Sequence, residues 1–208
     1  LQLVSGRSPM EAGLLLVPGL VVTILAGLFA VRLVRRIAPA TVVTVSLGLN
    51  AVAFALVAVA GDRGSDLLLL TAFTLLGAGV GAAETLTNDL ILSAVPAEKA
   101  GAASAISETA YETGAVLGTA VLGSLLNLAY RTHLQLPGEL TDAQGAAASE
   151  TLGGAAAVAR DLPAAVAYPL LDSAREAFDS GVLLTSGIGT VLMVIAAVVA
   201  HRTLRAAG

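Results

Sequence analysis

Five long stretches of the 208-residue chain carry no charged side chain, and this feature limits the possible folds most strongly. They cover residues 12–31, 37–61, 67–83, 113–130 and 181–200. A helix needs roughly 20 residues to cross about 30 Å of hydrocarbon, so each stretch is close to the length of one membrane span. Charged residues make up only 12% of the chain, whereas a soluble domain carries about 25%. The sequence therefore predicts an all-α membrane protein with five transmembrane helices.

The predicted spans divide the chain into three parts. Residues 1–130 hold four helices, at about 12–31, 37–61, 67–94 and 100–130, because the apolar pattern runs past the charge-free limits of the third and fourth stretches. Residues 131–179 form a long Ala-rich loop, with Thr141 and Asp142 placed to cap a short helix. Residues 180–208 hold the last helix and a tail.

Basic residues fall unequally on the two sides of the membrane if the spans alternate. The richer side receives Arg32, Arg35, Arg36, Lys99, Arg202 and Arg205. The short segments of the other side hold only Arg7 and Arg63. The positive-inside rule then predicts a multi-pass protein of the inner (plasma) membrane, with a cytoplasmic C-terminus and loop 131–179 outside the cytoplasm. Because Leu1 would start outside, we expect a further helix upstream, in a missing N-terminal half.

Loop 131–179 holds the whole formal charge of the chain. Its seven acids and three bases leave a net −4, equal to the total. Two interpretations remain open: a surface helical hairpin or partly disordered loop, and a lid over an external opening. The acidic balance argues against nucleic-acid binding. The chain has no Cys and only two His, so no metal site or thiol nucleophile is expected.

Four acids interrupt the third and fourth spans. They are Glu84, Asp89, Glu108 and Glu112. Counted from the turn between the spans at 1.5 Å per residue, Asp89 and Glu108 lie at a depth of roughly 13 Å, and Glu84 and Glu112 at roughly 20 Å. A carboxylate inside hydrocarbon is costly, so such residues usually face a cavity or a partner. We expect two acidic tiers at matched depths.

Small and polar side chains extend the acidic stripes along both helices. Those expected to line a cavity are Thr85, Asn88, Ser104, Tyr111 and Thr119. The acids can bind protons, attract a cationic substrate, or do both, and competition between proton and cation would be the simplest mechanism of exchange. The alternative is that they lie among lipid headgroups or bond a neighbouring hydroxyl in helix packing.

Glycines and arginines supply two further patterns. Gly114 and Gly118 form a GxxxG pair, and Gly77, Gly79 and Gly81 line the third span, which is typical of close helix packing or of a sliding surface. The segment GLFAVRLVRR at residues 27–36 ends the first span. Its arginines either anchor the topology or make a gating contact.

Several segments resemble the C-terminal part of a major facilitator superfamily transporter, and more narrowly the 14-span drug:proton antiporter group of multidrug and quaternary-ammonium exporters. The most specific match is VPAEKAGAASA (95–105) followed by ETAYETG (108–114) and LGTAVLGS (117–124). Residues 1–14 and 174–181 resemble entries to helices. Residues 27–36 resemble a cytoplasmic loop motif that would include Gly27, Arg32, Arg35 and Arg36.

The resemblance implies spans ten to fourteen of a transporter that exports organic cations or lipophilic drugs by alternating access. The proton gradient would supply the energy, without a cofactor, and Glu108 and Glu112 occupy positions that this group uses for drug recognition or proton coupling. Two alternatives stay open: a uniporter or importer of the same fold, and a non-transporting membrane scaffold whose loop 135–178 binds a partner. An intramembrane enzyme lacks a nucleophile or metal set.

Overall fold

The computed structural model describes residues 8–63 and 66–206. Residues 1–7, which include Arg7 and half of the 1–14 segment, lie outside the described residues. The described ranges form helices joined by turns, with no strand. Five helices are long and apolar enough to cross a membrane. They are α2 (Pro9–Leu33), α3 (Pro39–Arg63), α4 (Asp66–Ser93), α5 (Ala100–His133) and α8 (Ala164–Ala206). The predicted all-α architecture with five spans is confirmed.

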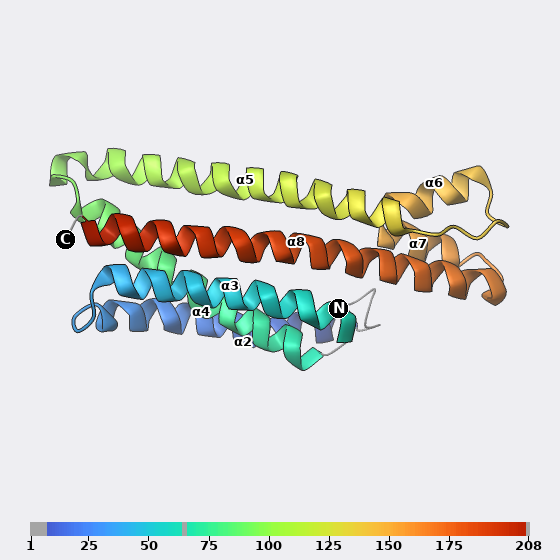
Figure 1. Cartoon of the computed structure of the whole chain (residues 1–208), viewed down its shortest axis with the longest axis horizontal. Coiled ribbons are helices and arrows are strands. Elements are labelled where there is room, and N and C mark those ends of the chain that lie inside the picture. Colours follow the sequence, from blue (N-terminus) through green and yellow to red (C-terminus); the bar gives the residue numbers. More distant parts are fainter. Residues whose placement is uncertain (1–7, 64–65, 207–208) are drawn as a thin grey trace.

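The helices lie roughly along one common direction, with α5 at one edge, α8 beside it and α2, α3 and α4 on the other side (Figure 1). Helix α3 packs against both α4 and α8, and α4 also packs against α2. Helix α5 packs mainly against α8 and touches α4 only sparsely. The bundle therefore has a densely packed part, in which α2, α3 and α4 pack together and α8 packs on α3, and one helix, α5, that is held mainly along α8.

Glycines of α4 allow the dense side to form. A Cβ atom at Gly77 would come within 2.5 Å of the Gly19 carbonyl oxygen of α2 and 2.6 Å of Thr23 Oγ1. A Cβ at Gly79, on the opposite side, would overlap Asn50 of α3. Small residues let transmembrane helices approach closely enough for extensive van der Waals contact. The predicted packing role of the glycines in this span is confirmed for both neighbours.

One end of the bundle gathers the arginines. A buried cluster there joins Ala30 of α2, Val42 and Val43 of α3 and Leu86 of α4, with Leu204 of α8 packed against it. Arg32, Arg35 and Arg36 follow closely on α2, and Arg202 and Arg205 lie on the last turns of α8. We call this the arginine end. An alternating topology places the end of α2, the start of α3, the end of α4 and the end of α8 on one side of the membrane, and the structure brings these four helix ends together.

The opposite end is a small helical module (Figure 1), which we call the cap and define as residues 131–179. It contains α6 (Asp142–Glu150), α7 (Leu152–Ala159) and the first part of α8. At 1.5 Å per residue, the 34 residues of α5 span about 51 Å and the 43 of α8 about 64 Å. Both helices exceed the hydrocarbon thickness of about 30 Å, and the cap is built on their projecting ends.

Small side chains of the cap pack around one tyrosine from the end of α5. Ala148, Ala155 and Leu170 of the cap are buried in one cluster with Tyr130 of α5. The Tyr130 hydroxyl donates to the Ala148 carbonyl oxygen at 2.9 Å, and Asn127 Nδ2 donates to the Glu150 carbonyl oxygen at 2.7 Å. Because these bonds link α5 directly to α6, the cap is fixed on the end of α5.

The last helix begins earlier than the sequence interpretation placed it. Helix α8 starts at Ala164, whereas the loop was expected to run to residue 179. Charged residues between 172 and 179 end the apolar pattern, but helix formation in water needs no continuous apolar run, since charged side chains can stay solvated on one face. The predicted cap at Thr141 is confirmed, because its hydroxyl accepts a hydrogen bond from the Gln144 N–H at the start of α6.

Candidate functional site

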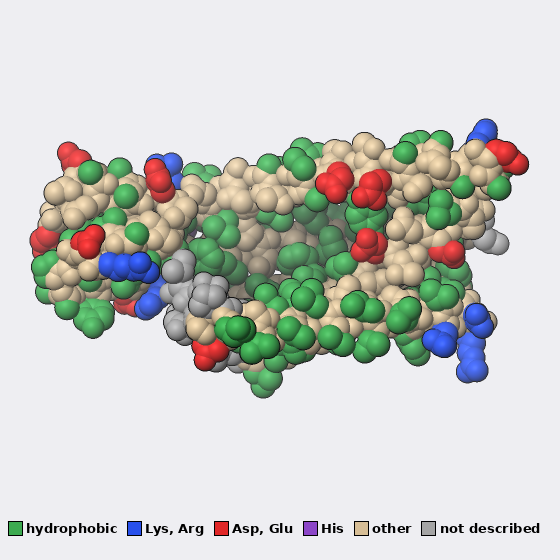
Figure 2. Space-filling view, turned by 180° about the vertical axis from the view of Figure 1, so that it is seen from behind, with side chains coloured by type: hydrophobic (Ala, Val, Ile, Leu, Met, Phe, Trp, Pro, Cys, Tyr) green, Lys and Arg blue, Asp and Glu red, His purple; other side chains and the backbone are tan. Residues whose placement is uncertain are grey.

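The four intramembrane acids lie on two consecutive antiparallel helices. Glu84 and Asp89 belong to α4, and Glu108 and Glu112 belong to α5. The helices are joined by an extended Pro96 and a single 3₁₀ turn, Ala97–Lys99, at the arginine end. All four side chains are exposed in the described chain. Acidic side chains lie on α5 and on the bundle across from it, around a hollow (Figure 2).

One hydrogen bond marks the register between α4 and α5. Ser107 Oγ donates a hydrogen bond of 3.4 Å to Asn88 Oδ1. With this pair aligned, Tyr111, one helical turn further from the connecting turn, lies near the level of Glu84. Glu84 thus lies at the level of Tyr111, which is the sequence neighbour of Glu112. Asp89 lies close to the level of Glu108. This register gives the two acidic tiers matching heights along the bundle.

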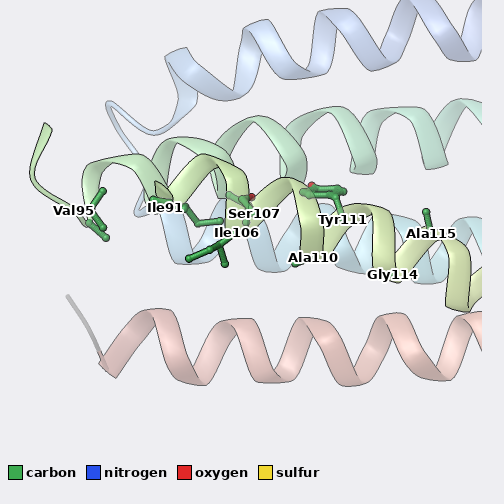
Figure 3. A pocket seen from close by; sticks show the side chains of 11 residues that line it. Ile91, Val95, Ile106, Ser107, Ala110, Tyr111, Gly114 and Ala115 are labelled. Atoms are coloured by element: carbon green, nitrogen blue, oxygen red, sulfur yellow. The ribbon is translucent and has the colours of Figure 1, made fainter. Parts of the chain in front are cut away.

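A groove of about 890 Å³ opens beside the α4–α5 contact (Figure 3). Its lining is almost wholly apolar and includes Ile91 of α4, Val95 of the connecting turn, and Ile106 and Ala110 of α5. Thr87, Ser107 and Tyr111 are its polar side chains. The four carboxylates are not among the lining residues.

The expectation of one polar wall on each helix needs correction at this groove. Of its lining residues, Thr87 of α4 is one position from Asn88, and Ser107 and Tyr111 of α5 are one position from Glu108 and Glu112. One position turns about 100° around a helix, so the acidic stripes flank the groove instead of lining it. An apolar surface thus lies next to a carboxylate-bearing one, an arrangement that suits an amphipathic cation.

The predicted lining residues fall into different surroundings. Tyr111 lines this groove, and Thr119 lines a separate one of about 570 Å³ further along α5 towards the cap. Thr85 donates to the Gly81 carbonyl oxygen within its own helix. Ser104 and Asn88 are exposed. Asn88, Tyr111 and the acids lie at similar heights on α4 and α5, whereas Thr119 lies nearer the cap.

Ser107 is the site residue that the sequence interpretation missed. It is buried, unlike most of α5, and it carries the hydrogen bond to α4. One signal in the sequence could have indicated it. If α4 and α5 are aligned as an antiparallel pair from the Ala97–Lys99 turn, Ser107 comes to lie opposite Asn88. Hydropathy does not separate it from the other serines of the helix.

The GxxxG pair of α5 is not a packing surface within the described chain. A Cβ atom on Gly114 or Gly118 would meet nothing within 4 Å, and Gly114 lines the groove. The reason is that α5 has a close neighbour only along α8, so this face is left open. Gly27 of the cytoplasmic-loop motif does pack, since a Cβ there would lie 2.8 Å from Thr85 Oγ1. Arg32, Arg35 and Arg36 are exposed.

Five helices that are long and apolar enough to cross a membrane define a multi-pass membrane protein, and exposed acids lie within two of these helices, α4 and α5. Residues 2–134 match the sequence model of the Major Facilitator Superfamily. The chain belongs to this family of membrane transporters.

Curated relatives include drug-resistance transporters. The chain is 49% identical over 199 residues to the multidrug efflux pump LfrA of Mycolicibacterium smegmatis, covering 96% of the chain and 40% of the pump. It is 36% identical over 197 residues to the methyl viologen resistance protein SmvA of Salmonella typhimurium, covering 94% and 40%. It is 32% identical over 216 residues to the tetracenomycin C resistance and export protein of Streptomyces glaucescens, covering 99% and 40%. The chain spans about 40% of the length of these relatives.

Proposed function

We propose that residues 1–208 form the C-terminal part of a proton-coupled multidrug efflux transporter, which exports organic cations or lipophilic drugs by alternating access between two halves. The observation that carries the proposal is the pair of acidic tiers on α4 and α5, at matching heights and beside an apolar groove. The printed names of the relatives support it, since they describe efflux or resistance.

The mechanism rests on competition for the carboxylates. An ionised carboxylate among apolar helices is stabilised by either a proton or an organic cation, and binding of one disfavours the other. Glu112 and Glu84 form the deeper tier and would release and rebind the proton. Glu108 and Asp89 lie nearer the arginine end, where a cation entering from that side meets them first. The groove lined by Ile106 and Ala110 would take the apolar part of the drug.

The arginine end would face the cytoplasm and the cap would lie outside. The positive-inside rule supports this orientation, because Arg32, Arg35, Arg36, Lys99, Arg202 and Arg205 gather at the arginine end. In this orientation Glu108 and Asp89 form the tier nearer the cytoplasm, from which an exporter takes its substrate. The cap would then cover the outer ends of α5 and α8.

The direct test uses the complete transporter that contains this segment, reconstituted into liposomes with methyl viologen outside as the cationic probe. When the liposome interior is acidic, transporters inserted with the arginine end facing the medium should drive accumulation of the probe inside the liposome against its concentration gradient, while protons leave. A protonophore should abolish the accumulation. Uptake that ignores the pH gradient would indicate a uniporter, and uptake driven by an acidic exterior would indicate import; either result would contradict the proposal.

The division of roles between the tiers makes a separate prediction. Glu108→Gln removes the negative charge that a cation meets first, and we expect about tenfold weaker binding of methyl viologen, equivalent to about 1.4 kcal/mol. The dissociation constant is measured by equilibrium binding to the purified complete transporter. Glu98→Gln, at the exposed 3₁₀ turn, is the matched control and should bind normally. An unaltered dissociation constant for Glu108→Gln would rule out its role in cation binding.

A further inference from the structure

A second groove runs along α2, away from the acids. It has a volume of about 480 Å³ and is lined by Val22, Leu25, Ala26, Leu28, Phe29 and Arg32. Leu25, Leu28 and Phe29 are 57%, 60% and 61% exposed. The groove is thus an open apolar channel on the helix surface that ends at a guanidinium group.

The dimensions of the groove fit one leaflet of a membrane. From Val22 to Arg32 the helix rises about 15 Å, which is half of the roughly 30 Å hydrocarbon thickness. The span of α2 ends at Leu33, so Arg32 lies at the level where hydrocarbon meets headgroups. A molecule that fills the groove therefore has an extended apolar part and a polar part at the membrane border.

The charge at the border is strongly positive. Arg32, Arg35 and Arg36 follow within five residues and are all exposed, and no acidic residue occurs between Glu11 and Asp62 in the sequence. Guanidinium groups bind phosphate oxygens through paired hydrogen bonds, which an ammonium group cannot match in geometry. Basic groups next to a transmembrane helix attract anionic lipids. The complementary ligand is a phosphate monoanion that carries an acyl chain.

We propose that this site binds one anionic phospholipid of the leaflet at the arginine end. Its acyl chain lies along α2 against Leu25 and Phe29, and its phosphate is held by Arg32 with Arg35 or Arg36. The apolar groove includes Arg32 in its lining, and Arg35 and Arg36 follow within four residues, which distinguishes the site from a surface that only attracts phosphate. A zwitterionic lipid offers the same acyl chain, but its headgroup also carries a cationic group that the arginines repel.

The test uses the complete transporter in mixed micelles that contain phosphatidylglycerol and phosphatidylcholine with identical acyl chains. Native mass spectrometry counts the lipids that stay bound to the folded protein. We expect preferential retention of phosphatidylglycerol, reduced about tenfold in the combined variant Arg32→Gln, Arg35→Gln, Arg36→Gln. The matched control is Arg202→Gln with Arg205→Gln at the same end, which should retain it.

A second variant separates the groove from simple charge attraction. Ala26→Phe fills the channel but keeps every arginine, and it should lose the lipid as well. Glycerol phosphate without acyl chains should not compete. Equal retention of both lipids, an equal loss in the Arg202 and Arg205 control, or full retention in Ala26→Phe would overturn the proposal. So would the absence of any retained phosphatidylglycerol, the result expected if another part of the transporter covers this face.

Discussion

The two sides of the bundle are built in opposite ways. Helices α2, α3 and α4 are packed so closely that Gly77 and Gly79 of α4 have no room for a side chain. Helix α5, in contrast, carries Gly114 and Gly118 with open space in front of both, and contacts α4 at few points. Both helices carry glycines four residues apart in sequence, Gly77 with Gly81 and Gly114 with Gly118. The difference teaches that the same glycine spacing serves close packing on α4 and leaves an open face on α5, the helix that carries Glu108 and Glu112.

The cap adds a further contrast along α5 itself. At its cap end, α5 holds buried Tyr130, which is bonded to α6. Towards the arginine end, Ser107 is the buried exception in an otherwise exposed surface. A helix anchored at one end and loosely held at the other can change its contacts to α4 without unfolding. We expect the Ser107–Asn88 contact to be the one that changes between transport states.

The largest effect is expected on the dense side. Gly77→Ala places a methyl group against the Gly19 carbonyl oxygen and Thr23, so we expect a loss of about 1–3 kcal/mol of stability. Gly118→Ala adds the same methyl group in open space and should change stability by less than about 0.5 kcal/mol. Thermal unfolding of both purified variants measures this. Equal losses of stability in the two variants would contradict the contrast between the two sides, since α5 would then be packed as closely as α4.

An intermediate effect is expected in the cap. Tyr130→Phe leaves the Ala148 carbonyl oxygen without its hydroxyl donor and should cost about 1 kcal/mol. Hydrogen exchange of the α6 amides should accelerate accordingly. The control is Tyr168→Phe, because Tyr168 is 73% exposed and its hydroxyl can bond water in either state. Unchanged exchange in Tyr130→Phe would show that the cap does not depend on its link to α5.

The smallest effect is expected at the α4–α5 contact. Ser107→Ala removes one long hydrogen bond to Asn88, and such bonds between membrane helices contribute about 0.6 kcal/mol on average. Ser104→Ala, on the exposed face, is the control. A double-mutant cycle with Asn88→Ala isolates the pair in thermal unfolding. A coupling of several kcal/mol would contradict the idea of a loosely held α5.

The spans were predictable because a membrane imposes one simple requirement on sequence. Backbone groups must bond within the segment, so an apolar run of sufficient length becomes a helix whatever its neighbours do. Thr141 as a helix cap was predictable for a similarly local reason, since its hydroxyl satisfies an N–H three residues on. Such interactions depend on nearby residues only.

Contacts between helices were harder to predict from the sequence. Gly77 and Gly114 have the same local pattern of small residues, and only the position of a neighbouring helix decides which is packed. The start of α8 at Ala164 was missed because the interpretation followed apolarity, which ends where the helix leaves the membrane. The polar stripes of α4 and α5 were recognised, but their rotation away from the groove depends on the packing angle, which the stripes alone do not determine.

The most direct measurement compares Glu112→Gln with Glu139→Gln in the complete transporter, reconstituted in liposomes with an acidic interior. Glu139 lies in the cap, exposed and outside the spans, so its variant should accumulate methyl viologen like the unmodified transporter. Glu112→Gln cannot release a proton from the deeper tier, and its pH-driven accumulation should fall about tenfold or more, equivalent to at least about 1.4 kcal/mol. Full pH-driven accumulation by Glu112→Gln would contradict the central claim that the acids of α4 and α5 couple protons to export.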